Sequence, residues 1–167
     1  MASRIEDYAM IGDCETAALV GRDGSIDWLC WPRFDSAACF ARLLGTSDNG
    51  RWLLSPEAEP LEVRRRYRPG TMILETEFRT HTGAAKVIDF MPVDGASDLI
   101  RIVCGLSGNV PFQTELVLRF DYGSTVPWIT RNEDGTIEAI AGPERTVLRT
   151  SANLHGEDLK TVGNFTV

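Results

Sequence analysis

The sequence is poor in the residues and motifs that build metal and cofactor sites. Histidine occurs twice, at His81 and His155, far apart in the chain. The four cysteines are Cys14, Cys30, Cys39 and Cys104. None of them forms the C-x-x-C spacing of a zinc site. A glycine-rich phosphate loop, an H-E-x-x-H motif and a G-x-S-x-G motif are also missing. We therefore expect neither a bound metal nor a cofactor.

Charge, hydropathy and the first residues exclude further classes. The formal net charge is −7, which argues against a nucleic-acid surface because such a surface needs a basic footprint. No apolar run approaches the ~18 residues of a membrane span. Residues 1–8 lack a basic segment followed by an apolar core, so we expect no signal peptide. We interpret the cysteines as buried free thiols in a reducing compartment and predict a cytoplasmic protein.

The length fits one domain. A chain of 167 residues can bury roughly 70% of its unfolded surface, so it needs no disulfide or metal to fold. We assign residues 1–167 to a single domain. The last segment, Leu159–Val167, has the pattern of a strand and stops without a turn or a charged tail. This suggests that the domain is cut before its natural end.

Apolar residues recur mainly at every second position, which is typical of strands. The alternation is clearest over Val110–Phe120 and returns over Met72–Phe78. The segment Leu99–Leu106 is apolar on both faces apart from Arg101, which predicts a strand in the middle of a sheet.

Turn signals separate the predicted strands at short intervals. They are Asp23-Gly24, Thr82-Gly83, Ser107-Gly108-Asn109 and Asp134-Gly135. Asp-Gly suits a hairpin turn because both central residues adopt positive φ. The segment Ala37–Leu44, followed by Gly45, is the one helix candidate. We predict an all-β fold, an antiparallel, supersandwich-like β-sandwich with at most one or two short helices.

Acidic residues supply a possible chemistry. Glycoside hydrolysis needs two carboxylates, and candidates are Asp27, Asp35, Asp89 and Glu75. Since 24 acidic residues are present, each candidate is also open to a solvated or turn position. The one basic run, Val63–Arg68, predicts an exposed edge strand protected by charge, with a sugar-phosphate or partner contact as the alternative.

Aromatic residues gather around one corner, at Gly24–Ser36. There an apolar run with two tryptophans stops at Pro32, which ends strand pairing. Aromatic side chains can stack on the apolar face of a sugar ring, although they also dominate cores. The aromatic candidates for such stacking are Trp28, Trp31, Phe34, Tyr122 and Trp128.

Several separated motifs of this sequence occur in the order found in one known family. They are Ile5–Asp13, Thr16–Val20, Asp23–Cys30, Pro32–Ser36, Arg66–Thr71, Asp89–Pro92, Arg119–Gly123 and Pro127-Trp128. Together they resemble the start of bacterial trehalases of the glucoamylase-like family, glycoside hydrolase family fifteen. One departure is Ala37, where the family pattern has proline, a change that would loosen the corner without altering the fold.

The resemblance implies an amino-terminal β-sandwich that precedes an (α/α)₆ barrel in the same polypeptide. In the family that barrel carries the two catalytic glutamates of an inverting hydrolase. The present chain has no segment for such a barrel, so we assign it no catalytic residue and expect it to be inactive alone. The implied partners are the barrel and an α-glucoside or trehalose substrate. The specificity could be that of α,α-trehalase or of a glucan 1,4-α-glucosidase.

We hypothesise that the corner forms a wall of the substrate pocket or an interface with the barrel. The residues concerned are Trp28, Trp31, Arg33, Phe34 and Asp35. Two other functions stay open: a free-standing carbohydrate-binding or interaction module, and an enzyme complete in itself. A domain without its barrel would also expose apolar surface and could self-associate.

Overall fold

The computed structural model describes residues 4–93 and 97–167 and is all-β, as predicted. The strands are β1 (Tyr8–Gly12), β2 (Ala17–Gly21), β3 (Ser25–Cys30), β4 (Ala38–Ala41), β5 (Arg51–Pro56), β6 (Glu62–Tyr67), β7 (Leu74–Arg79), β8 (Gly83–Phe90), β9 (Ile100–Gly108), β10 (Pro111–Val117), β11 (Trp128–Arg131), β12 (Ile137–Ala141), β13 (Glu144–Leu148), β14 (His155–Glu157) and β15 (Lys160–Thr166). In the described residues the helical elements are short 3₁₀ turns, namely η1 (Ile5–Asp7), η2 (Arg42–Leu44), η3 (Ser47–Asn49) and η4 (Asp121–Gly123).

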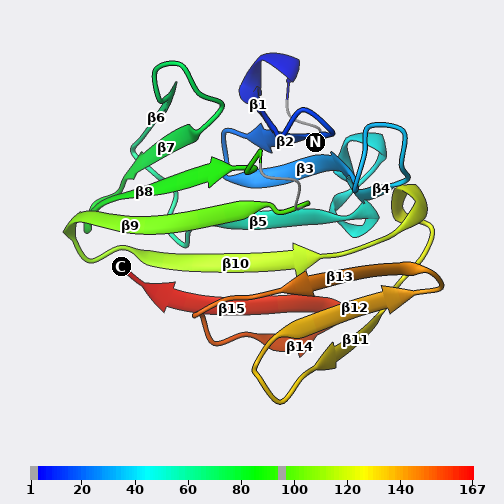
Figure 1. The fold of residues 1–167 in the computed structure, drawn as a ribbon. Coiled ribbons are helices and arrows are strands. Elements are labelled where there is room, and N and C mark those ends of the chain that lie inside the picture. The colour runs from blue at the N-terminus through cyan, green and yellow to red at the C-terminus, as the bar shows by residue number, and fades with distance from the viewer. Residues whose placement is uncertain (1–3, 94–96) are drawn as a thin grey trace.

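The strands form three antiparallel sheets (Figure 1). The large sheet has the order β1-β2-β3-β5-β10-β15-β14, and β4 pairs with β3 beside this path. A four-stranded sheet has the order β6-β7-β8-β9, and a three-stranded sheet has the order β11-β12-β13. Since β5 and β10 are neighbours although far apart in sequence, the large sheet is held together by long-range pairing.

The predicted turns lie between strands. Asp23-Gly24 connects β2 to β3, Thr82-Gly83 joins β7 to β8, and Asp134-Gly135 lies between β11 and β12. Gly24 and Gly135 both have positive φ, which explains the preference for glycine at these turns. The turn at Ser107-Gly108-Asn109 differs, because it leads from the four-stranded sheet into β10 of the large sheet.

The predicted helix at Ala37–Leu44 is wrong. Its first half forms β4, and only the second half turns, as η2. Trp28 and Leu29 of β3 pair with Ala41 and Phe40, and all four residues of β4 are buried. A short run of helix-favouring residues is therefore overridden by burial in the sheet.

The prediction that Leu99–Leu106 lies in the middle of a sheet is also wrong for the residues described. All of this segment but Leu99 lies within β9, which pairs with β8 alone among the described strands. Ile102 and Leu106 remain 43% and 48% exposed. β9 thus has the apolar pattern of a strand with two neighbours, although it lies at the edge of its sheet.

The core lies between the large sheet and the four-stranded sheet. Phe112 of β10 meets Phe78 of β7 edge to face, with ring centroids 6.3 Å apart. The ring of Phe165 on β15 stacks on the Phe112 ring, with the two centroids 5.8 Å apart. A second cluster contains buried residues of β1, β2, β3 and β4 together with Leu74 of β7. It extends to Ala139 of the three-stranded sheet. Apolar burial therefore joins all three sheets.

A buried ion pair links the two main sheets. Arg101 of β9 and Asp89 of β8 are both almost fully buried, and their Nε and Oδ1 atoms lie 2.8 Å apart. The guanidinium also donates to the carbonyl oxygen of Trp52 at 2.6 Å and to that of Gly24 at 2.7 Å. It lies 5.2 Å from the centre of the Trp52 ring. We call this group the inter-sheet clamp; one guanidinium satisfies acceptors from both layers.

The basic run forms β6, an edge strand, as predicted. Its arginines split between the two faces. Arg66, and Arg68 just after the strand, bind Glu75 on β7, while Arg65 donates to the carbonyl of Val20 on the other side. Lys86 of β8 completes the group around Glu75 at 3.1 Å. The hydrogen bond from Arg68, with those from Lys86 and Arg66, lowers the pKa of Glu75 from 4.5 to about 2.

Removal of the clamp cation should destabilise the fold strongly. The substitution Arg101→Met leaves the Asp89 carboxylate buried without its partner, and we expect a loss of about 3–5 kcal/mol in the free energy of unfolding. Urea denaturation measures this loss. Arg64→Met is the matched control, because Arg64 pairs only with Glu62 at the surface, and it should leave the midpoint unchanged. Equal midpoints for the two variants would contradict the role of the clamp.

Glu75 should make the fold sensitive to acid. The pKa of Glu75 is lower in the folded state than in the unfolded chain. Its contribution to the free energy of unfolding is therefore complete above about pH 4.5 and falls as the pH drops toward 2. Urea midpoints of the wild type and of Glu75→Gln can be compared at pH 6 and pH 3. The advantage of the wild type should shrink at pH 3. A difference that does not depend on pH would argue against these ion pairs.

Candidate functional site

The corner after β3 divides into an inward and an outward part. Trp31 packs against the large core cluster, and the peptide bond that follows it to Pro32 is cis. Phe34, in contrast, is 63% exposed, and the side chains of Arg33 and Asp35 are 67% and 78% exposed. Trp31 therefore anchors the corner, and the three residues after Pro32 face solvent.

Short polar contacts define the shape of the corner. The Arg33 Nε lies 3.2 Å from Asp35 Oδ1. The backbone N–H of Phe34 donates to the carbonyl of Glu15 at 2.9 Å, and the N–H of Ser36 donates to that of Arg33 at 3.1 Å. These bonds tie the corner to the turn between β1 and β2. The corner therefore has a defined turn although Ala37 replaces the proline of the family pattern.

Trp28 lies apart from the outward residues of the corner. It packs beside Cys30, Ala38 and Ala41, and its ring centroid is 6.2 Å from that of Tyr122. The register of β2 against β3 shifts beside it, since Leu19 and Val20 pair with Trp28 and Ile26. Asp27 is the extra residue of this bulge, and bulges of this kind redirect side chains. The five predicted residues thus occupy three environments.

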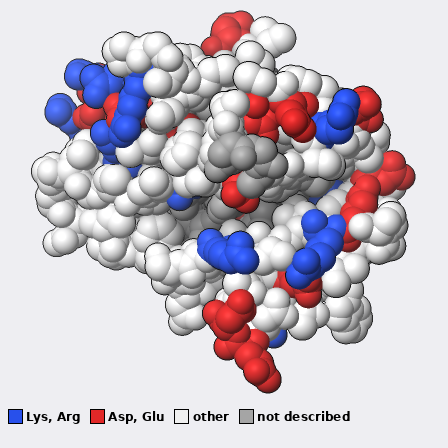
Figure 2. All heavy atoms as spheres, viewed as in Figure 1, with Lys and Arg blue, Asp and Glu red and all other residues white. Residues whose placement is uncertain are grey.

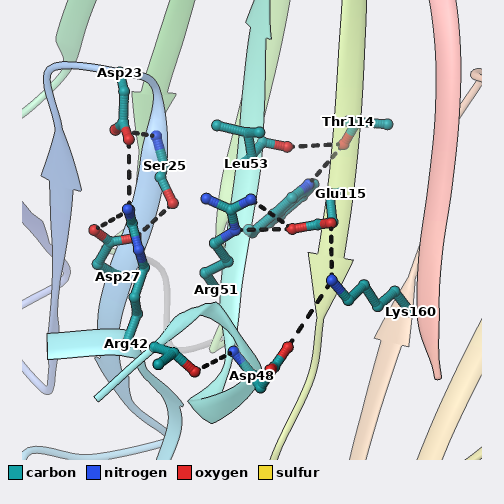
Figure 3. Close-up of polar contacts among 12 residues, drawn as sticks. Asp23, Ser25, Asp27, Arg42, Asp48, Arg51, Leu53, Thr114, Glu115 and Lys160 are labelled. Atoms are coloured by element: carbon teal, nitrogen blue, oxygen red, sulfur yellow. Dashed lines mark hydrogen bonds and ion pairs between the residues drawn. The ribbon is translucent and has the colours of Figure 1, made fainter. Parts of the chain in front are cut away.

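Asp27 is the centre of a buried polar network (Figure 3). Its carboxylate accepts a hydrogen bond from the Tyr8 hydroxyl at 2.6 Å and lies 2.7 Å from Arg42 Nη1. The Ser25 hydroxyl is a third donor, and Arg42 also reaches Asp23 at 3.4 Å. The carboxylate is thus fully engaged in joining β1, β3 and η2. The sequence singled out Asp27 but gave no sign of Arg42, which lies 15 residues further on.

A second network crosses the large sheet between β5, β10 and β15 (Figure 3). Glu115 lies 2.6 Å from Arg51 Nη2 and 3.3 Å from Lys160 Nζ, and Lys160 reaches Asp48 at 3.9 Å. Burial opposes ionisation of Glu115, but the contacts with Arg51 and Lys160 prevail, so its pKa is lowered. Sequence reasoning missed this cluster because its members come from separate strands.

Each of the four carboxylates that the sequence singled out has an arginine partner in the described structure. Asp27, Asp89 and Glu75 each bind at least one arginine, and Asp35 is exposed at the corner. A general acid needs a raised pKa, whereas that of Glu75 is about 2. Their contacts are those of structural ion pairs that hold strands and turns together.

Three further observations concern the described part of the chain. Residues 4–93 and 97–167 contain no group of three or more histidine, cysteine or acidic side chains that could hold a metal ion. Within the same residues, no helix has the length and apolar character needed to cross a membrane. All four cysteines are free, but Cys14 is exposed at positive φ in the turn after β1, so its predicted burial is wrong. Burial raises the pKa of the Cys30 thiol.

The chain is similar to several trehalases. It is 35% identical over 138 residues to a trehalase of Mycolicibacterium smegmatis, and the aligned region covers 71% of this chain and 20% of that protein. It is 33% identical over 160 residues to Trehalase 1 of Sulfolobus acidocaldarius, and the aligned region covers 95% of this chain and 27% of that protein. Relatives therefore occur outside bacteria, and a bacterial origin is not established. No solved structure gives a significant match.

The extent of these matches agrees with the expected domain order. The chain spans about a fifth to a quarter of the length of the curated relatives it matches. Residues 1–154 match the family described as "Trehalase-like, N-terminal". The match includes every residue of the corner and of the Asp27 network. The chain belongs to the trehalase-like N-terminal domain family.

Proposed function

We propose that this chain is the non-catalytic N-terminal domain of an inverting α-glucosidic glycoside hydrolase. The catalytic acid and base lie in an (α/α)₆ barrel of the same polypeptide. The family assignment and the partial coverage of relatives named trehalase support this proposal. The relatives favour α,α-trehalose as substrate over a 1,4-linked glucan. The arginine-bound carboxylates agree with a domain that supplies no catalytic acid.

The exposed end of the corner is the part of the domain that contacts the barrel or the substrate. The observation that carries this assignment is the combination of a half-buried anchor at Trp31, packed on the core, with an outward Phe34. Arg33 and Asp35 flank the exposed ring and offer hydrogen bonds of both kinds. An apolar surface with a polar margin suits a domain interface or the wall of a sugar site. Trp31 anchors the corner on the core, whereas Trp28 lies apart beside Tyr122.

The corner can be tested in the full-length polypeptide with Arg33→Ala. We expect kcat/KM for trehalose or the thermal midpoint to fall, because the substitution removes a charged donor from the contact. Arg4→Ala is a matched control, since Arg4 forms a similar exposed ion pair with Glu6. Wild-type values of both quantities for Arg33→Ala would show that the corner is neither site nor interface.

A free-standing sugar-binding module is the second candidate function, and one observation favours it. Trp128 of β11 is 79% exposed, and an indole ring so placed is open to a sugar face.

Titration of residues 1–167 with trehalose or maltooligosaccharides, followed by tryptophan fluorescence, tests this candidate. Binding should be saturable in the millimolar range and lost in Trp128→Ala, whereas Trp31→Phe, at the core anchor, should retain it. A flat titration of the wild type would count against a binding module.

A further inference from the structure

A long groove lies beside β9. It has a volume of about 770 Å³, and β9, β10, β13 and β15 all contribute to its lining. We call it the β9 groove; its lining includes residues 100–103, Thr114, Leu116, residues 146–148 and residues 165–167. Figure 2 shows a hollow between the upper and lower halves of the molecule. The groove therefore interrupts the layer that covers the large sheet, between the edge of the four-stranded sheet and the three-stranded sheet.

The strand at the rim of this groove lacks the protection usual for an edge. Natural edge strands carry charges, prolines or short lengths that prevent pairing with another chain. β6, at the other edge of the same sheet, contains three consecutive arginines, and blue side chains gather there in Figure 2. β9 extends over nine residues, and its only charged side chain, that of Arg101, is buried in the clamp. The β6 edge of the four-stranded sheet is thus guarded by charged side chains, and the β9 edge is open because it has no such charges.

The sequence of β9 also fits a strand with neighbours on both sides. Its outward residues include Ile102, which is 43% exposed, and Leu106, which is 48% exposed. On the inner side Val103 packs on the core cluster around Phe78. Apolar residues on both faces are typical of strands inside a sheet, and here they meet solvent at the edge.

We propose that the β9 groove is a site for strand addition, filled by an extended segment of the same polypeptide from outside residues 1–167. The segment pairs with the open backbone edge of β9 and lies over β10 and β15. Its alternate side chains are apolar, because Leu116 and Phe165 line the floor of the groove. This inference rests on the longer polypeptide of the proposed function, and relatives of which this chain covers only 20% and 27% have the necessary length.

A second folded copy does not fit this edge. Antiparallel pairing of two β9 strands relates the copies by a two-fold axis perpendicular to the sheet, so both large sheets lie on the same side. The large sheet continues past β9 through β10 and β15 (Figure 1). Residues 146–148 of β13 line the groove as well. The large sheets of the two copies would occupy the same space. A slender segment of one or a few strands avoids this collision.

Amide hydrogen exchange tests the proposal. In residues 1–167 alone, the β9 amides that point away from β8 should exchange within about tenfold of unstructured rates. In the full-length polypeptide they should exchange at least about 100-fold more slowly. The outward amides of β6 are the matched control at the guarded edge, and their rates should be equal in the two proteins.

A charge at the open edge gives a second test. Ile102→Lys should raise the β9 exchange rates in the full-length polypeptide at least about tenfold, because a lysine on an edge strand opposes strand addition. In residues 1–167 it should leave β9 exchange unchanged. Ile129→Lys is the control, since Ile129 lies on the edge strand β11 with a similar exposure of 46%.

The outcomes separate this inference from the proposed function. Full-length protein that hydrolyses trehalose but leaves the β9 amides unprotected overturns the strand addition and leaves the proposed function intact. Protected β9 amides in a full-length protein without hydrolase activity overturn the proposed function and leave the strand addition intact. Protection in residues 1–167 that grows with protein concentration would show that a second copy occupies the edge, and would overturn the choice of occupant.

Discussion

The inter-sheet clamp is the contact on which the arrangement of the two main layers depends. Apolar side chains between the sheets supply most of the burial, but the hydrophobic effect that drives it has no direction. The Arg101 guanidinium does not, because it must lie within hydrogen-bond distance of Asp89, Trp52 and Gly24 together. The clamp therefore fixes the position of β9 above the large sheet.

Much of the fold followed from periodicity and turn chemistry. The alternation over Val110–Phe120 predicted β10, and glycine turns predicted three of the hairpins. Local patterns failed where distant partners decide the outcome. Residues 38–41 have helix-favouring character, but pairing with β3 makes them a strand. The apolar pattern of β9 predicted neighbours on both sides, and the described residues supply one.

The candidate site was predictable only in part. The cluster of aromatic and polar residues at 28–35 was visible in the sequence, but its division into a half-buried anchor and an exposed tip was not. That division depends on contacts with distant residues, such as the hydrogen bond from the backbone N–H of Phe34 to the carbonyl of Glu15. The partners of Asp27 and Glu115 were equally hidden, because Arg42, Arg51 and Lys160 come from other elements. Sequence reasoning singled out Asp27 but found neither Glu115 nor these three cations.

The turn from β9 to β10 has a consequence for the way in which the groove accepts a ligand. Gly108 has a φ of +67°, and a Cβ atom there would lie 2.1 Å from the carbonyl oxygen of Thr82. A Cβ on Gly83 would lie equally close to that of Ser107. The two backbones are thus in direct contact where the chain passes between layers, so the end of β9 is held against the start of β8. A segment that pairs with β9 would meet an edge already held in place, and the loss of conformational entropy would fall on the incoming segment.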